Sequence, residues 1–246
     1  MLTNTDQTQL GILSKRFDNF LVGRTNEDAV RQCLSLAKGG ADSPNLLMLC
    51  GPSPCGKTHL LCSIYNDIRQ NTPQTTVQYI AYDTFISRYI EAVHKDDTQA
   101  FMRNDCACDV LLVDNIHLLV GLEATQECLS ELFLTLCAQG KRIVLACDRP
   151  VSCLQTLTTP WEEAISTFKV VQLEKPDFAL RKQLLLRELR TSDVSLLSEL
   201  TDSIAASERI SFGAIPGILR TLSLLGRVTG EAPDAQAIAE VIRAYE

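Results

Sequence analysis

The chain has 246 residues, 46% of them hydrophobic, which is enough to bury the core of one domain, or of one domain with a small lid. Its formal net charge is −7, so binding to nucleic acid would need a local basic patch or a partner, because neutralising phosphates requires clustered Lys and Arg. No apolar stretch is long enough to cross a membrane and the polar N-terminus lacks the features of a secretory signal, so we expect a cytoplasmic protein.

Short apolar runs alternate with helical patterns through the first two thirds of the chain. Strands alternating with helices of this length are typical of a parallel sheet covered by helices, so we predict an α/β domain. The four residues 25–28, Thr-Asn-Glu-Asp, predict a capping box at the start of the first helix. The predicted strands are Leu46–Cys50, Val77–Tyr82, Val110–Asp114, Ile143–Cys147 and Lys169–Leu173. The predicted helices are Asn26–Lys38, Gly56–Arg69, Thr84–Val93 and Ala124–Ala138.

After Pro176 the pattern changes to helices alone. In the last of them, Ile238, Val241, Ile242 and Tyr245 recur at helical spacing and form one apolar stripe. The predicted helices here are Phe178–Arg190, Ser192–Ser207, Ser211–Leu225 and Asp234–Tyr245. We therefore predict an N-terminal tail (1–14), an α/β nucleotide-binding domain (15–175) and a small helical lid domain (176–246).

A phosphate-binding loop is predicted between the first strand and the following helix. The eight residues Gly51, Pro52, Ser53, Pro54, Cys55, Gly56, Lys57 and Thr58 fit the pattern G-x-x-x-x-G-K-[ST]. The glycines let backbone N–H groups turn toward phosphate, and the helix start adds its positive end. We predict that these residues, with His59, bind ATP or ADP. Lys57 would reach the β- and γ-phosphates and the Thr58 hydroxyl would bind Mg²⁺.

A carboxylate for the metal is predicted at the end of another strand. Asp114 follows the apolar run Leu111–Val113, where a charged residue is costly to place without a function. The alternative is an ordinary strand-end Asp that caps the next turn. Because the phosphate loop is present, we favour the metal-linked role for Asp114.

Four segments together resemble the AAA+ module of the bacterial replication initiator family, DnaA. They are the opening box 17–26, the phosphate loop with its helix (56–61), the magnesium strand 111–116 and the segment 140–150. The resemblance implies that Leu21, Val22 and Gly23 lie near the adenine, although they could instead form only an entry strand. It also implies that Asp148 senses the γ-phosphate.

Three positions depart from the family's catalytic pattern. Asn115 replaces a second acid after Asp114, and an amide activates water poorly. No Arg occurs between Arg149 and Arg181, and Thr167 falls near the expected arginine finger. Gly213 falls where the family has a nucleotide-sensing Arg, although Arg209 and Arg220 flank it. We therefore predict tight nucleotide binding with slow hydrolysis, with Asp114, Asn115 and Asp148 as the catalytic positions.

The chain stops after the lid helices, where the family usually continues into a DNA-binding domain. We therefore expect no sequence-specific DNA binding, and the chain resembles the short, Hda-type replication regulators. The resemblance implies that the tail segment Gln9–Leu13 could dock on the polymerase sliding clamp. The alternative is that this segment packs on its own domain.

Three functions are compatible with these observations. The favoured one is a nucleotide-dependent switch that controls replication initiation by pairing, through AAA+ interfaces, with an initiator or with a second copy of itself. The second is an active ATPase that assembles on single-stranded DNA as an initiator or helicase loader. The third is the central fragment of a longer initiator. The region 84–103 carries Arg88, His94, Lys95 and Arg103 but also Glu91, Asp96 and Asp97, which argues weakly against DNA binding.

Overall fold

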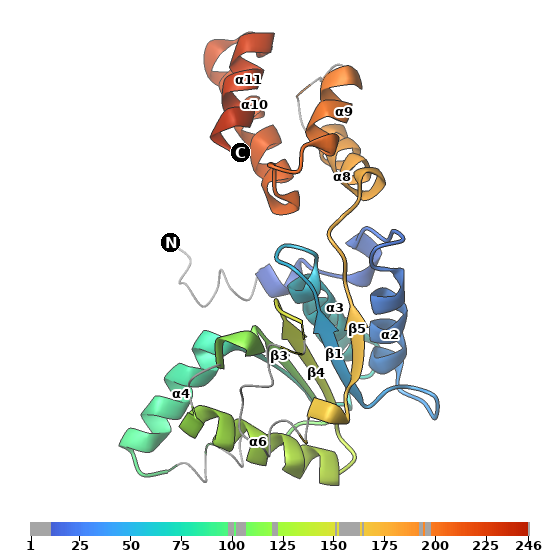
Figure 1. The fold of residues 1–246 in the computed structure, drawn as a ribbon, viewed down its shortest axis with the longest axis vertical. Coiled ribbons are helices and arrows are strands. Elements are labelled where there is room, and N and C mark those ends of the chain that lie inside the picture. The colour runs from blue at the N-terminus through green and yellow to red at the C-terminus, as the bar shows by residue number, and fades with distance from the viewer. Residues whose placement is uncertain are drawn as a thin grey trace. The chain divides into compact units, whose positions relative to one another are not determined.

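The chain divides into two compact units, which are coloured along the sequence in Figure 1. A computed structural model describes residues 11–97, 101, 107–119, 123–150, 152, 163, 165–191, 194 and 198–245. The first unit, called the α/β unit below, comprises Met1–Phe20 and Asn26–Glu174. The second, called the helical unit, comprises Leu21–Thr25 and Lys175–Glu246. Each unit has its own hydrophobic core.

A five-stranded parallel sheet forms the centre of the α/β unit. The strand order is β2-β3-β4-β1-β5, so the chain crosses over between neighbouring strands, as the predicted α/β fold requires. All the strand pairs are parallel, which confirms the predicted fold class. The strands are β1 (Leu46–Cys50), β2 (Val77–Ala81), β3 (Val110–Asp114), β4 (Arg142–Cys147) and β5 (Lys169–Gln172).

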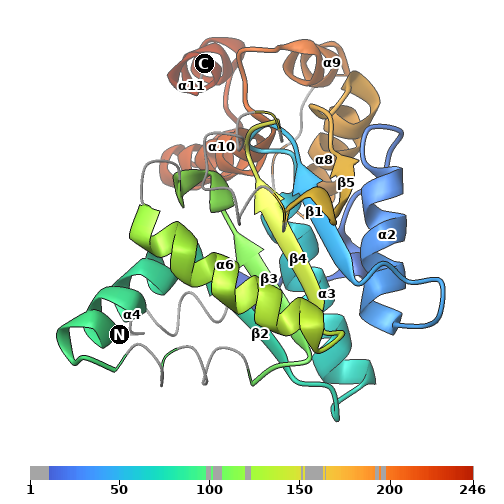
Figure 2. The ribbon, with the colours of Figure 1, turned by 60° about the horizontal axis from the view of Figure 1, so that its bottom comes forward.

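Helices cover both faces of this sheet (Figure 2). On one face α2 (Glu27–Lys38) and α3 (Lys57–Asn71) pack against alternate residues of the strands. On the other face α4 (Tyr82–His94) and α6 (Glu123–Ala138) do the same. Because both faces are covered, the three central strands β1, β3 and β4 are largely apolar runs, which is why they could be recognised from sequence.

The parallel arrangement brings the carboxyl ends of all five strands to one edge of the sheet, where β3, β4 and β1 are consecutive neighbours. In the register of β1 with β4, Cys50 lies opposite Cys147, and in that of β2 with β3, Ala81 lies opposite Asp114. The loops that leave β1, β3 and β4 therefore start side by side. In open α/β sheets, ligands bind outside these carboxyl ends.

Four helices with an apolar core make up most of the described part of the helical unit. They are α8 (Phe178–Thr191), α9 (Ser198–Ala206), α10 (Ile215–Thr229) and α11 (Ala235–Ala244), with the short 3-10 turn η4 (Phe212–Ala214) before α10. Leu21 packs against this core. The third predicted helix of this region is thus a 3-10 turn followed by α10, because Pro216 fits the first turn of a helix but not its interior.

Two local findings complete the fold. The predicted capping box at residues 25–28 is wrong: Asn26 is the N-cap of α2 without a side-chain capping bond, and within the described residues the buried Thr25 hydroxyl has no hydrogen-bond partner.

None of the helices in the described part of the chain combines the length and apolar character that crossing a membrane would require.

Candidate functional site

The phosphate loop (residues 51–58) connects β1 to α3, and its two glycines are required by close packing. A Cβ atom on Gly51 would lie 2.4 Å from the Leu173 carbonyl oxygen. Gly56 has φ +104°, and a Cβ there would lie 2.7 Å from the ring of Phe20. Both positions therefore exclude a side chain, and Gly56 also adopts a backbone conformation that L-residues avoid.

The amine of Lys57 lies at the centre of the loop. It donates hydrogen bonds to the carbonyl oxygens of Gly51, at 2.7 Å, and Pro52, at 3.2 Å. It also forms an ion pair with Asp148 Oδ1 at 2.8 Å, although Asp148 comes from the end of β4. The Lys57 side chain is only 5% exposed. The loop carbonyls and the Asp148 carboxylate together hold its amine in place.

Other groups of the loop and the adjacent helix start surround this amine. Cys55 Sγ lies 3.6 Å from Lys57 Nζ, and burial raises the pKa of the Cys55 thiol. Because α3 begins at Lys57, the N–H groups of its first turn, including that of Thr58, have no carbonyl of the same helix to bind. An amine, helix N–H groups and a close-packed turn are together suited to an anionic group such as a polyphosphate.

A hydroxyl and a carboxylate meet beside the loop. Thr58 Oγ1 donates to Asp114 Oδ2 at 2.7 Å, the Tyr79 hydroxyl lies 3.1 Å from the same oxygen, and the Asn115 N–H donates to Oδ1 at 3.0 Å. Asp114 is 2% exposed. Burial, with the nearby charge of Asp114, raises the pKa of Tyr79. Because Mg²⁺ prefers oxygen ligands and keeps several waters, this pair of oxygen donors fits the ion.

Asn115 lies in the left-handed backbone region, with φ +61°. Asn and Asp tolerate this region better than other non-glycine residues, so the position accepts either of them at a lower conformational cost. An amide at position 115, in place of the second acid that the family resemblance implies, therefore changes the chemistry of the side chain and not the backbone conformation.

The exits of β3 and β4 are joined by a hydrogen bond from a backbone N–H to a side chain. The Asp148 N–H donates to His117 Nδ1 at 3.3 Å, and burial lowers the pKa of His117. Asp148 is thus held by its backbone to His117 and by its side chain to Lys57.

The His59 side chain contacts the segment Arg16–Phe20, which precedes α2. Its ring lies edge-on to Phe20, with the ring centroids 5.0 Å apart. Its Nε2 lies 3.0 Å from both the Arg16 carbonyl oxygen and Asn19 Oδ1. The His59 side chain therefore holds residues 16–20 against α3. The contact of His59 with a nucleotide stays a prediction.

The three predicted adenine contacts belong to the helical unit. Leu21 packs against the helical core, Val22 is 48% exposed, and a Cβ on Gly23 would lie 3.2 Å from Leu180 Cδ1. Their contact with a base stays a prediction.

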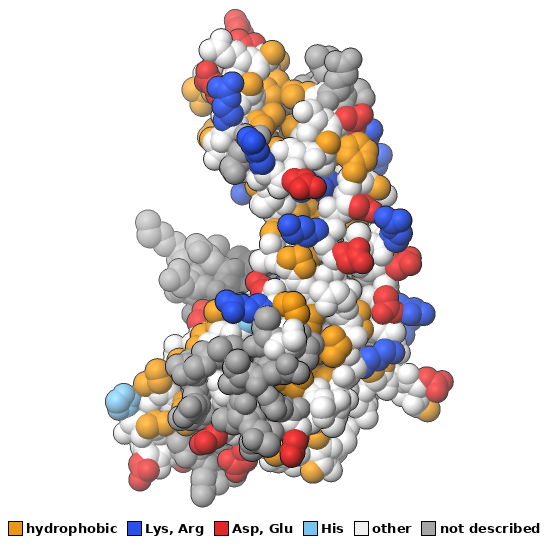
Figure 3. Space-filling model, in the orientation of Figure 1, with side chains coloured by type: hydrophobic (Ala, Val, Ile, Leu, Met, Phe, Trp, Pro, Cys, Tyr) orange, Lys and Arg blue, Asp and Glu red, His pale blue; other side chains and the backbone are white. Residues whose placement is uncertain are grey.

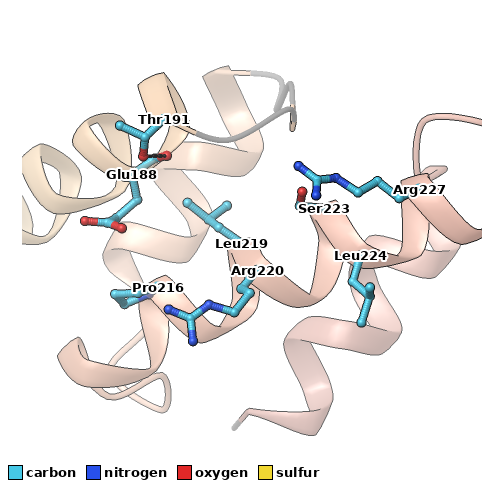
Figure 4. Close-up of a pocket in the computed structure, with 8 residues that line it drawn as sticks. All are labelled: Glu188, Thr191, Pro216, Leu219, Arg220, Ser223, Leu224 and Arg227. Atoms are coloured by element: carbon cyan, nitrogen blue, oxygen red, sulfur yellow. Dashed lines mark hydrogen bonds between the residues drawn. The ribbon is translucent and has the colours of Figure 1, made fainter. Parts of the chain in front are cut away.

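Exposed positions include the expected site of the sensing Arg, Gly213, with its flanking residues Arg209 and Arg220, and the expected arginine-finger position, Thr167. Gly213 lies in η4, and Thr167 lies in the turn before β5. Arg220 lies on α10 and lines a pocket of about 490 Å³ that is bounded by residues of α8 and α10 (Figure 4). The pocket also includes Glu188 and Thr191 from α8, and Leu219, Leu224 and Arg227 from α10.

Sequence reasoning missed three residues that touch the site: Phe20, Tyr79 and His117. Each contacts a residue that is distant in sequence, so no local motif identified it. Tyr79 offered the clearest signal, because a Tyr in a mainly apolar strand needs a partner for its hydroxyl.

The predicted clamp-docking segment lies at the edge of the described residues. Gln9 and Leu10 lie outside them. The Ile12 carbonyl oxygen accepts a hydrogen bond from Asn66 Nδ2 at 2.8 Å, whereas Leu13 is 52% exposed.

The family model of the bacterial DnaA ATPase domain matches residues 13–169. The chromosomal replication initiator protein DnaA of Herpetosiphon aurantiacus is 32% identical over 216 residues, which are 87% of this chain and 46% of the relative. The chain therefore spans about half the length of this relative.

Two solved structures have the same fold. Domain III of the Thermotoga maritima replication initiation protein DnaA superposes with a TM-score of 0.85 at 27% identity, covering 94% of this chain and 97% of that domain. A replication initiator DnaA bound to AMPPCP and single-stranded DNA gives a TM-score of 0.78 at 25% identity, covering 87% of this chain and 66% of that one.

Proposed function

Because this chain belongs to the family of the bacterial DnaA ATPase domain, we propose that it binds ATP or ADP with Mg²⁺ and acts as a nucleotide-dependent switch in the control of replication initiation. One observation carries the proposal: the Lys57 amine and the Thr58–Asp114 pair lie at the same edge of the parallel sheet, at the mouth of a glycine-dependent loop. The relative bound to AMPPCP supports an adenine nucleotide as the ligand.

Each group has a distinct task in nucleotide binding. Lys57 would leave its contacts with the loop carbonyls to bind the β- and γ-phosphates, and the first-turn N–H groups of α3 would bind phosphate oxygens. Thr58 and Asp114 would hold Mg²⁺ directly or through water. An ion held there by Thr58 and Asp114 would supply positive charge that offsets the negative charge of the phosphates.

Slow hydrolysis follows from the groups that would act on water. Asn115 offers an amide where a carboxylate would orient and polarise the attacking water. Asp148 is paired with Lys57 and would meet the phosphate end of the nucleotide with a negative charge. We therefore propose that the site binds nucleotide tightly and turns it over slowly, so that ATP and ADP mark two long-lived states.

The proposed partner is a replication initiator or a second copy of this chain, engaged through AAA+ interfaces. The compartment would be the cytoplasm, and the free thiols of the described cysteines agree with a reducing environment. Docking of Gln9–Leu13 on a sliding clamp belongs to the same proposal.

An ATPase that assembles on single-stranded DNA is the second candidate, favoured by the relative that is bound to such DNA. In this chain Lys95 on the segment after α4 is paired with Glu91, at 2.6 Å. On the face shown in Figure 3, acidic side chains lie between the basic ones, so its described residues form no continuous basic surface. These charges disfavour the strand-binding candidate.

Nucleotide titrations test the proposal. Purified protein should bind a fluorescent ATP analogue in excess MgCl₂, and Lys57→Ala should lose this binding, whereas the exposed Lys38→Ala should keep it. Hydrolysis should be slow and insensitive to single-stranded DNA. A wild-type protein that takes up no adenine nucleotide would contradict the proposal, and a rate stimulated by DNA would favour the second candidate.

A further inference from the structure

The carboxylate of Asp114 is held by donors from three separate elements. Thr58, at the start of α3, and Tyr79, on β2, both bind Oδ2, and the N–H of Asn115 binds Oδ1. Tyr79 belongs to neither the phosphate loop nor the strand that carries Asp114. Its hydroxyl is nevertheless only 3.1 Å from the carboxylate.

The strand register explains how Tyr79 reaches this position. Tyr79 lies opposite Leu112, and Ala81 lies opposite Asp114, so Tyr79 is two residues before the partner of Asp114. Side chains two residues apart in a strand lie on the same face of a sheet, so Tyr79 and Asp114 are diagonal neighbours. The ring of Tyr79 is partly buried against the core under α2 and α3, which fixes the direction of its hydroxyl.

We propose that Tyr79 is a positioning residue for the magnesium site, which holds the Asp114 carboxylate in the orientation that faces Thr58. This inference rests on the proposed function. The Thr58 oxygen would bind the ion through a lone pair while its O–H donates to Asp114, and Tyr79 adds a second side-chain donor that keeps Oδ2 from rotating away. Tyr79 thereby acts on the ion through Asp114 and does not touch it.

The test is the dependence of nucleotide affinity on magnesium in Tyr79→Phe. The substitution removes only the hydroxyl, so the ring keeps its packing. The affinity for a fluorescent ADP analogue is measured in excess MgCl₂ and in EDTA. Because one net hydrogen bond is lost, the gain in affinity that Mg²⁺ provides should fall by about 3- to 10-fold. The affinity in EDTA should stay unchanged.

A matched control is available in Tyr65→Phe. Tyr65 is also partly buried against the same core, and its hydroxyl accepts a hydrogen bond from Arg69 at 2.9 Å, away from the metal ligands. This control should show the full wild-type gain from Mg²⁺. In an Asp114→Ala background, Tyr79→Phe should have no further effect on that gain, because the two residues act in series.

The outcomes separate this inference from the function on which it rests. If wild-type protein binds nucleotide more tightly with Mg²⁺ and Tyr79→Phe does so equally, the positioning role is wrong while the nucleotide site stands. An equal loss of affinity in MgCl₂ and in EDTA would show a merely structural role and would also overturn the inference. Absence of nucleotide binding by the wild type would overturn both proposals.

Discussion

Replacing Gly56 with Ala is expected to destabilise the α/β unit through two separable effects. Gly56 is the N-cap of α3 and has φ +104°, ψ 6°. An L-residue at positive φ costs about 1–2 kcal/mol. In addition, the new methyl group would lie 2.7 Å from Phe20 Cε2 and 2.9 Å from Cζ, and overpacking of this kind costs about 1–3 kcal/mol. The expected loss of unfolding free energy is therefore about 2–5 kcal/mol.

Urea unfolding of the whole chain, followed by far-UV circular dichroism, measures this loss. Gly140→Ala isolates the backbone effect, because Gly140 also has positive φ, at +67°, but a Cβ there would meet no atom within 4 Å. We expect that control to lose about 1 kcal/mol. The double variant Gly56→Ala with Phe20→Leu removes the crowding ring atoms and should recover part of the loss relative to the sum of the single variants.

Two results would refute this reasoning. If Gly56→Ala lost no more stability than Gly140→Ala, the close approach of Phe20 would carry no energetic weight. If the single losses of Gly56→Ala and Phe20→Leu simply added in the double variant, the two residues would not be coupled. The phosphate loop would then owe its glycine to backbone conformation alone.

Three further changes have expected outcomes. Asp109→Asn should lower the unfolding free energy by about 1 kcal/mol at neutral pH, a figure that allows for the exposure of the side chain. The reason is that hydrogen bonds, first from Lys141 and then from Thr76, lower the pKa of Asp109 from 3.8 to about 2. A lowered pKa stabilises the fold above about pH 4, so the cost measured by urea unfolding should vanish as the pH falls toward 2. Arg181→Met should destabilise the helical unit by about 3 kcal/mol in the same assay, because this buried guanidinium donates to the carbonyl oxygens of Ala205, at 2.7 Å, and Ile210, at 2.8 Å. Asn115→Asp should raise single-turnover ATP hydrolysis about tenfold or more, since it restores a carboxylate that polarises water.

Each of these has a control and a contradicting result. Asp18→Asn, at a side chain that is 75% exposed, should show little effect at any pH, and a cost at Asp109 that persisted in acid would rule out the ion pair as its origin. Arg190→Met, an exposed change on the same helix as Arg181, should be nearly neutral. If Asn115→Ala accelerated hydrolysis as much as Asn115→Asp, the carboxylate would not be the cause.

Much of the fold was predictable from the sequence because its signals are local. Leu46–Cys50 and Val110–Asp114 are continuous apolar runs, since parallel strands covered on both faces need no polar side, and the structure has both with the predicted bounds. The predicted helix 192–207 was less accurate, since Val194 lies outside any helix, and within the described residues α9 covers Ser198–Ala206. The capping box failed because Thr25 matched the pattern without making the bond.

The sequence by itself determined the glycine-containing turn between β1 and α3, the strand that ends in Asp114 and the alternation of strands and helices, since each depends on residues that are neighbours along the chain. Only the tertiary structure decided that Asp148 pairs with Lys57, that Phe20 closes over Gly56 and that Tyr79 binds Asp114. These contacts join residues that are far apart in the chain, and they depend on strand order and register. Periodicity carries no information about which strands become neighbours, so side-chain partners across the sheet appear only once the chain has folded.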